Sequence, residues 1–307
     1  MHLLHRGAIV VVLGSGSKGN CTYVGDGKSG VLIDCGLSTR QIADRMTLAG
    51  LTGDGPLGAP IDAVLITHEH SDHVSAAGVL DRRLAAEDAL AVPFYMTEGT
   101  RRRVNSKVMP RNVQRSRADH AFRVGGLLIE PISVSHDTPE PVAYLIDVRG
   151  TRVGVITDLG KSTPGVERAF ASLDVAVLEY NHDLTMLRDG PYPPELKRRI
   201  EGPWGHLSND QAAEITTRAG SRLSHLVLAH LSEENNTPAR AERAASAALH
   251  SIGRRDVTVL VGSPTEPVQV VATRPTAPVR PTAPVRPARS SHVPPEQGSL
   301  FGPSPWA

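Results

Sequence analysis

Residues 67–73 place four potential metal ligands in six positions, directly after the apolar residues 63–66. The four are His68, His70, Asp72 and His73. Imidazole and carboxylate donors at this density fit a borderline divalent cation such as zinc, manganese or iron better than they fit a solvated turn. The segment therefore predicts a strand that ends in a metal-binding loop.

The spacing of these side chains predicts two ions rather than one. Residues two apart on an extended backbone point the same way, so His68 and His70 can bind one ion while Asp72 and His73 turn toward a second. Two neighbouring ions generate a nucleophile at neutral pH and neutralise charge on the attacking and leaving oxygens of a displacement. The spacing predicts hydrolysis, but it does not separate phosphodiester, thioester and lactam substrates.

The pattern H-x-H-x-D-H resembles the signature of the metallo-β-lactamase superfamily, and the resemblance covers roughly residues 8–261. It implies three further metal ligands, each at the end of a β-like run: His136, Asp158 and His230. His136 would complete the site of the first ion and His230 that of the second, with Asp158 between the two ions.

Four more segments carry a narrower resemblance. They are residues 13–20 (LGSGSKGN), 135–138 (SHDT), 205–209 (GHLSN) and 229–236 (AHLSEENN). Together they look like the bacterial YycJ (WalJ) branch of the superfamily, whose members are described as nucleases, with 5′-to-3′ exonuclease action on DNA proposed for some. The resemblance therefore implies a two-metal phosphodiesterase, a DNA exonuclease of repair or processing. A thioester or lactone hydrolase of the glyoxalase type, and a non-catalytic metal scaffold tethered to a sliding clamp, remain the alternatives.

Asp72 and His206 are the candidate catalytic residues. The segment around His206 resembles a histidine motif that related tRNA-processing nucleases place beside the scissile phosphate. Imidazole titrates close to physiological pH, which suits a general acid that protonates the leaving oxygen. The alternative is an exposed histidine beside the cap of the following helix. Glu179, at the end of an apolar run, would orient a ligand or His206.

The order of the expected elements favours an α/β fold. Strands are expected near residues 8, 30, 62, 93, 127–156, 174 and 225, and helices near residues 38, 76, 164, 209 and 238. This order suits an αββα sandwich, which the resemblance to the metallo-β-lactamase type also implies, with the metal site at one rim of the two sheets. We expect residues 1–264 to form the catalytic domain.

Residues 265–307 are expected to form a disordered proline-rich tail. Residues 274–279 and 280–285 repeat the sequence RPTAPV, which is unsuited to a helix interior or a central strand. Near the end of the chain, a short segment resembles the Q-x-x-L-F peptide with which bacterial repair and replication proteins dock on the sliding clamp. Its matching residues are Gln297, Leu300 and Phe301. A passive tail is the alternative.

Charge is nearly balanced over the chain, at +1 for 307 residues, so bulk electrostatics neither demand nor forbid a nucleic-acid partner. Seven basic residues without an acid among them nevertheless gather within residues 101–117. They are Arg101, Arg102, Arg103, Lys107, Arg111, Arg115 and Arg117. This cluster is expected to contact the phosphates of DNA, with a solvated basic loop as the alternative. Aromatic residues amount to 4% of the chain, which disfavours a platform of several stacking residues.

A cytoplasmic location is expected from the beginning of the chain and from its cysteines. The first residues are polar, and the apolar run after them is too short for a membrane span or a signal core, so no membrane partner is expected. Cys21 and Cys35 lack the spacing of a metal site, and buried thiols in a reducing compartment are the expected state, with a disulfide as the alternative.

Overall fold

The computed structural model describes residues 7–53, 55, 57–85 and 92–272. The strands are β1 (Ala8–Gly14), β2 (Cys21–Gly25), β3 (Gly30–Ile33), β4 (Ala63–Leu65), β5 (Phe94–Met96), β6 (Val113–Arg115), β7 (Phe122–Val124), β8 (Leu127–Ser133), β9 (Val142–Val148), β10 (Thr151–Ile156), β11 (Val175–Glu179), β12 (His225–Ala229), β13 (Thr258–Val261) and β14 (Val268–Ala272). The helices are α1 (Thr39–Leu48), α2 (Ser71–Val74), α3 (Ala77–Ala85), α4 (Glu98–Arg103), α5 (Pro164–Phe170), α6 (Leu184–Asp189), α7 (Pro194–Glu201), α8 (Asn209–Thr216) and α9 (Pro238–Ser251).

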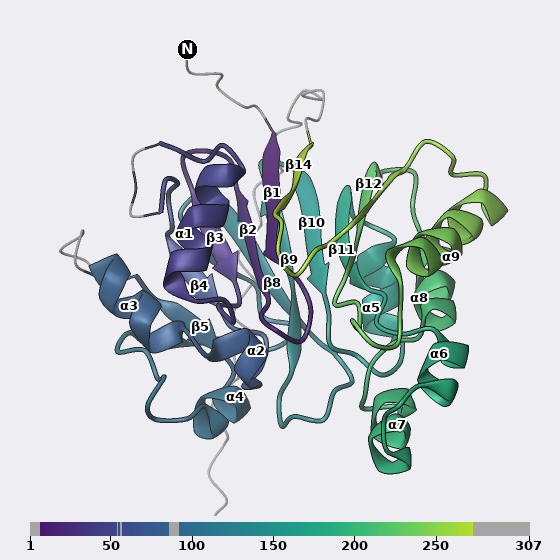
Figure 1. Cartoon of the computed structure of the whole chain (residues 1–307). Helices are drawn as coiled ribbons and strands as arrows, with labels where there is room; N and C mark the ends of the chain where they lie inside the picture. Colours follow the sequence, from purple (N-terminus) through teal and green to yellow (C-terminus); the bar gives the residue numbers. More distant parts are fainter. Residues whose placement is uncertain (1–6, 54, 56, 86–91, 273–307) are drawn as a thin grey trace, which may run out of the picture. The chain divides into compact units, whose positions relative to one another are not determined.

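Two seven-stranded sheets pack face to face in the described part of the chain. Their strand orders are β14-β1-β2-β3-β4-β5-β6 and β13-β12-β11-β10-β9-β8-β7. Helices α1 and α3 flank the first sheet, and α5, α8 and α9 flank the second (Figure 1). The αββα sandwich expected from the sequence is therefore confirmed.

The sandwich explains why its central strands are apolar on both faces. In β1, Val10 and Val12 point into the core between the two sheets, whereas Val11 and Leu13 pack with residues of α1 on the outer face. A strand covered on both sides must be apolar at every position, because each buried aliphatic side chain stabilises the fold by about 1.5–3 kcal/mol.

Strand direction determines where the site forms. Strands β3, β4 and β5 are parallel in the first sheet, as are β10, β11 and β12 in the second. Because the carboxyl ends of parallel neighbours meet at one edge of a sheet, the loops after these strands gather there. Most candidate ligands follow β4, β10 and β12, and His136 follows β8, which runs in the same direction as β10 because both are antiparallel to β9. The topology therefore brings the ligands together at this rim.

The expected end of the catalytic domain at residue 264 is wrong. Strand β14, which lies beyond that boundary, pairs with β1 in antiparallel register from Ala8↔Ala272 to Val12↔Val268. Its alternate side chains Val270 and Ala272 join the core between the sheets, which is why this segment belongs to the domain. The RPTAPV repeat and the segment with Gln297, Leu300 and Phe301 lie outside the described residues.

Both cysteines are buried free thiols, as expected. Burial raises the pKa of Cys21 and of Cys35, so neither is a reactive thiolate. No helix in the described ranges is long and apolar enough to cross a membrane.

Candidate metal centre

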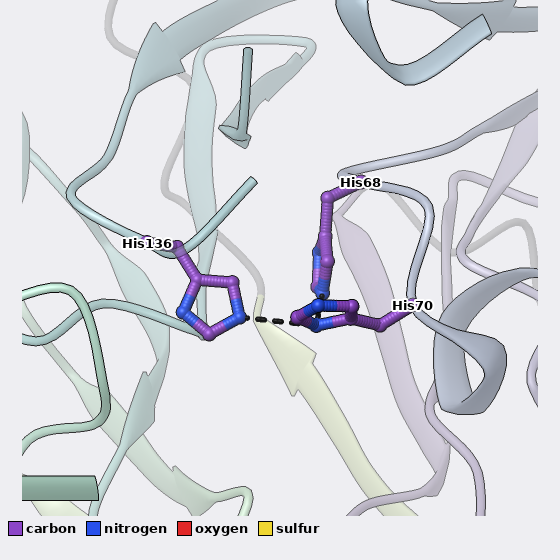
Figure 2. A group of neighbouring side chains, drawn as sticks. All are labelled: His68, His70 and His136. Carbon is purple, nitrogen blue, oxygen red and sulfur yellow. Dashed lines mark hydrogen bonds between the residues drawn. The ribbon is translucent and has the colours of Figure 1, made fainter. Parts of the chain in front are cut away.

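Three histidines from two separate segments point at one another at the rim of the sandwich (Figure 2). His68 and His70 follow β4, and His136 follows β8. His68 Nε2 lies 3.1 Å from His70 Nδ1, and His136 Nε2 lies 3.2 Å from the same atom. Nitrogens that converge in this way on one point offer their lone pairs to a single cation. The structure thus brings together the three residues expected at the first ion.

The three residues expected at the second ion also lie together. Asp72 and His73 belong to α2, and His230 follows β12. Asp72 Oδ2 lies 3.3 Å from His73 Nε2 and 3.5 Å from His230 Nε2. The three residues have one ligand atom each within 4.8 Å of one another. This set of donors matches a divalent cation that accepts both nitrogen and oxygen ligands.

Asp158 lies between these two groups. Its Oδ2 is 3.3 Å from His73 Nε2, and its Oδ1 is 3.9 Å from His136 Nε2. The residue is 2% exposed, and Oδ2 has no hydrogen-bond partner. An unsatisfied buried carboxylate oxygen is costly, and a cation on each side would satisfy it. The donor set therefore fits two divalent ions that share Asp158.

The helix α2 accounts for the division of the ligand motif between two groups. The sequence predicted a loop throughout, but His70 is the N-cap residue of α2, and Asp72 and His73 lie within the helix. The helical turn changes the direction of successive side chains by about 100° per residue, so the last two ligands leave the line of His68 and His70. The expected division is found, with a helix as its cause.

Three residues of the site have left-handed backbone conformations. Asp34, Asp158 and His230 follow β3, β10 and β12, and their φ angles are 61°, 60° and 55°. Such a conformation costs a non-glycine residue of order 1–3 kcal/mol, and it persists only where the surroundings enforce it. Each turn directs a polar side chain from the end of a buried strand toward the rim.

Asp34 was not recognised as a site residue from the sequence. Its Oδ2 accepts a hydrogen bond from His73 Nδ1 at 2.8 Å, and its carboxylate also accepts from the hydroxyl of Thr67. The bond to Nδ1 orients the imidazole so that Nε2 faces the other ligands. The signal available in the sequence is similar to that of Asp158, an aspartate within two residues of the end of an apolar strand.

Glu179 holds two histidines with one oxygen. Its Oε1 accepts from His206 Nδ1 at 2.9 Å and from His230 Nδ1 at 2.8 Å, while Oε2 accepts backbone N–H groups of Leu159 and Leu207. Burial by itself raises the pKa of Glu179, but the two imidazoles hold it below its usual value. The charged carboxylate therefore orients both rings, which is the role expected for it.

Protonation differs between the two groups of histidines. Burial and the neighbouring imidazoles lower the pKa of His68 well below 6.5, and burial together with His136 lowers that of His70. For His73 and His230, burial acts in the same direction, but nearby carboxylates, foremost Asp158, raise the pKa well above 6.5. His68 and His70 are thus neutral donors, whereas the carboxylates favour positive charge at the second group.

Five of the seven donors line a cavity of about 330 Å³ that opens to the surface: His70, Asp72, His136, Asp158 and His230. His206 lines it and is partly exposed, and the Arg199 side chain of α7 borders it. Arg199 pairs with Asp137, and the Asp137 carboxylate lies 3.5 Å from both His70 and His136. A cationic side chain beside the candidate ligands of the cavity suits an anionic substrate.

All seven basic residues of the 101–117 cluster are exposed, but several are partly neutralised. Arg101 and Arg102 pair with Glu98, and Arg111 pairs with Asp81. These acids come before the cluster in the sequence and reach it through the fold. Arg103, Lys107, Arg115 and Arg117 have no ion-pair partner among the described residues. Fewer basic residues are therefore available for binding phosphates than the sequence cluster contains.

Comparison with known proteins adds to this geometry. A family model described as "Beta-lactamase superfamily domain" matches residues 30–231. An exodeoxyribonuclease YycJ of Bacillus anthracis is 32% identical over 251 residues, covering 79% of this chain and 89% of that protein. An exodeoxyribonuclease WalJ of Streptococcus pneumoniae serotype 2 is 34% identical over 232 residues, covering 73% and 82% respectively. The crystal structure of the metallo-beta-lactamase fold protein YhfI from Bacillus subtilis superposes with a TM-score of 0.63 at 16% identity, over 86% of this chain and 100% of that one.

Proposed function

The chain belongs to the β-lactamase superfamily, and from that premise we propose that it is a two-metal phosphodiesterase that degrades DNA as an exonuclease. The observation that carries the proposal is the pair of donor groups with Asp158 between them, whose buried Oδ2 has no hydrogen-bond partner. Relatives named exodeoxyribonucleases, at 32% and 34% identity, support the choice of substrate. By the same resemblance we propose 5′-to-3′ polarity and a role in DNA repair or processing.

Two divalent ions fit the residues of the site. His68, His70 and His136 would hold one, Asp72, His73 and His230 the other, and Asp158 would contact both. When bound, such ions supply Lewis acidity and a nucleophile at neutral pH. Nitrogen and oxygen donors of this kind serve zinc, manganese and iron, and we propose zinc or manganese as the resident metal.

The protein's own groups position the substrate and move a proton. In the proposed reaction His206 donates a proton from Nε2 to the leaving oxygen, because Glu179 engages Nδ1 and stabilises the positively charged ring. Arg199, which lines the cavity and pairs with Asp137, would contact the phosphate. Arg103, Lys107, Arg115 and Arg117 would contact the backbone of the polynucleotide further away.

Incubation of metal-reconstituted protein with end-labelled double-stranded and single-stranded DNA and RNA tests the function. We expect cleavage of DNA from one end, with loss of activity in Asp72→Ala and retention of its circular dichroism spectrum. Cleavage of thioesters or lactones without cleavage of DNA would favour the glyoxalase-type alternative. Absence of turnover on every substrate, with both ions bound, would leave the scaffold alternative. Full activity of Asp72→Ala would refute the assignment of the site.

We also propose that the chain docks on the bacterial sliding clamp through Gln297, Leu300 and Phe301. The proposal rests on the Q-x-x-L-F sequence alone. A synthetic peptide of residues 295–303 should bind the clamp saturably, and the double variant Leu300→Ala with Phe301→Ala should not. Equal binding of both peptides would remove the proposal.

The two free buried thiols support the proposal that the protein acts in the cytoplasm, because oxidising compartments favour disulfides.

A further inference from the structure

We propose that a groove beside the metal cavity holds a single-stranded nucleic-acid segment continuous with the scissile phosphate, and that one base of this segment stacks on Trp204. The inference rests on the proposed nuclease function and adds the path of the strand and the residue that contacts a base. The aromatic composition of the chain disfavours a platform of several rings, but it leaves room for a single stacking position.

The groove consists of two cavities. The first adjoins the metal cavity, and the second adjoins the first. The first has a volume of about 400 Å³ and shares His136 with the metal cavity. The second, of about 340 Å³, shares Ser133, Val134 and Trp204 with the first. Cavities that share lining residues are neighbours, so a chain that leaves the metal centre past His136 can run along both and pass the indole of Trp204.

Trp204 is exposed yet held in place by its neighbours in the chain. Its exposed fraction is 56%, which is large for an indole in a folded domain. The carbonyl of Pro203 accepts a hydrogen bond from Ser135, and the carbonyl of Gly205 accepts one from His136 Nδ1 at 3.1 Å. The residues on both sides of Trp204 are thus held to Ser135 and His136, so the backbone at Trp204 is anchored beside a candidate metal ligand.

The groove has an excess of unpaired positive charge. Arg115 and Arg117 line its first cavity, and Lys161 and Arg168 line the second. All four are exposed and have no ion-pair partner among the described residues, unlike Arg101, Arg102 and Arg111 in the same sequence cluster.

The acids of the groove are fewer, and one is engaged elsewhere. Glu140 and Asp119 line the first and the second cavity. The Glu140 carboxylate accepts the backbone N–H of Gly99 at 2.6 Å. The ammonium of Lys161 lies 5.3 Å from the Trp204 ring centroid, a cation–π arrangement.

An exposed aromatic face among unpaired cations fits one class of ligand. Phosphates of a polynucleotide neutralise the cations, and an unpaired base offers a flat ring of the size of an indole. A base inside a duplex has both faces covered by its neighbours, so the groove favours a single strand or an unpaired end. A polyanion without rings would satisfy the cations but would leave the indole exposed.

Fluorescence of Trp204 provides the test. The chain has two tryptophans, so the full-length variant Trp306→Phe reports on Trp204 alone. A 12-mer of single-stranded DNA with phosphorothioate linkages, which resist cleavage, should quench this fluorescence saturably. A base-free 12-mer of the same charge should bind at least about 5-fold more weakly and without quenching, because stacking is lost. Equal affinity for the two oligomers would overturn the proposal.

Substitutions separate stacking from charge. Trp204→Ala should weaken binding of the labelled phosphorothioate 12-mer by at least about 5-fold and abolish the difference between this oligomer and the base-free one. Trp204→Phe should keep most of that difference. For each of Arg115→Ala and Arg168→Ala, the slope of log K against the logarithm of the salt concentration should become less steep by about 0.7, because one phosphate contact is lost. Arg243 is an exposed arginine on α9 that lines neither cavity, so Arg243→Ala should leave this slope unchanged.

Two outcomes distinguish this inference from the proposed function. If the metal-loaded protein cleaves DNA while Trp204→Ala binds both oligomers as the parent does, the groove assignment fails and the nuclease function stands. If quenching and the effect of Trp204→Ala are found without any cleavage, the nuclease function fails and the groove stands. Quenching by a short proline-rich peptide in place of the oligonucleotide would assign the groove to a peptide and overturn the proposal.

Discussion

At the scale of single residues, three of the candidate ligands are each oriented by a second polar group behind the ring. Asp34 fixes His73, the Gly205 carbonyl fixes His136, and Glu179 fixes His230. Such partners determine which ring nitrogen faces the ion and how basic it is. The effect of losing such a partner can therefore be measured with a substitution that leaves every candidate ligand in place.

Glu179→Gln should reduce kcat by about 10- to 100-fold and lower the metal content of the purified protein, because the neutral amide holds His230 and His206 less well. Steady-state cleavage of labelled DNA and elemental analysis measure the two effects. Glu214→Gln, at an exposed position of α8, is the matched control and should change neither. Parent-like kcat and metal content in Glu179→Gln would contradict the role given to Glu179.

The raised pKa values of His73 and His230 predict that the stability of the metal-free protein falls as pH rises, whereas its affinity for metal increases. In metal-free protein their protonated rings stabilise the fold fully below about pH 6.5, the ordinary imidazole pKa, and this stabilisation is lost as pH rises through the raised values. Binding of ions displaces these protons, so affinity for metal should increase with pH.

Thermal unfolding between about pH 6 and about pH 9 measures both effects. The difference in Tm between metal-loaded and metal-free protein should widen as pH rises. A constant difference across this range would show that the two rings do not exchange protons for metal.

At the scale of elements, the position of α2 depends on its close contact with the turn after β3. A Cβ at Gly36 would overlap the carbonyl oxygen of Asp72, so only glycine lets the helix approach this closely. Backbone N–H groups of Asn20 and Cys35 donate to the carbonyls of Asp72 and His73 at 2.7 and 2.8 Å. The position of two ligands thus depends on a residue that is not a ligand.

Gly36→Ala should displace α2 and destabilise the protein by about 1–3 kcal/mol, with loss of bound metal, because the clash is with backbone rather than with a flexible side chain. Urea unfolding and elemental analysis are the measurements. Gly165→Ala in α5 is the control, since its Cβ would make only an ordinary contact and alanine favours the helix. Equal stability of the two variants would argue against close packing at Gly36.

At the scale of the whole molecule, the last described strand, β14, is the edge strand of the first sheet and pairs with the first described strand, β1. Strand β14 covers β1, and its side chains Val270 and Ala272 enter the core between the sheets. Without β14, the edge of β1 and part of this core would be exposed to water.

Truncation after residue 266 should therefore lower Tm by roughly 3–12 °C relative to truncation after residue 272, as expected for loss of one buried valine in a domain of this size. Calorimetry of the two truncated proteins measures the difference. Identical midpoints would show that β14 contributes nothing to stability. The longer truncation keeps every described residue and is the reference for the shorter.

The sequence by itself determined the donor types of the H-x-H-x-D-H segment and the main strands and helices of the sandwich, because donor chemistry and apolar runs are local properties. The further ligands His136, Asp158 and His230 were predicted through the resemblance to the metallo-β-lactamase superfamily.

Only the tertiary structure decided what lies around these residues. Asp34 and the pairing of β14 with β1 depend on contacts between segments far apart in the chain, as do the acids that neutralise Arg101 and Arg111. The same is true of the place of Trp204 beside His136. Local sequence does not predict the distances between these segments, because they arise when the two sheets pack together.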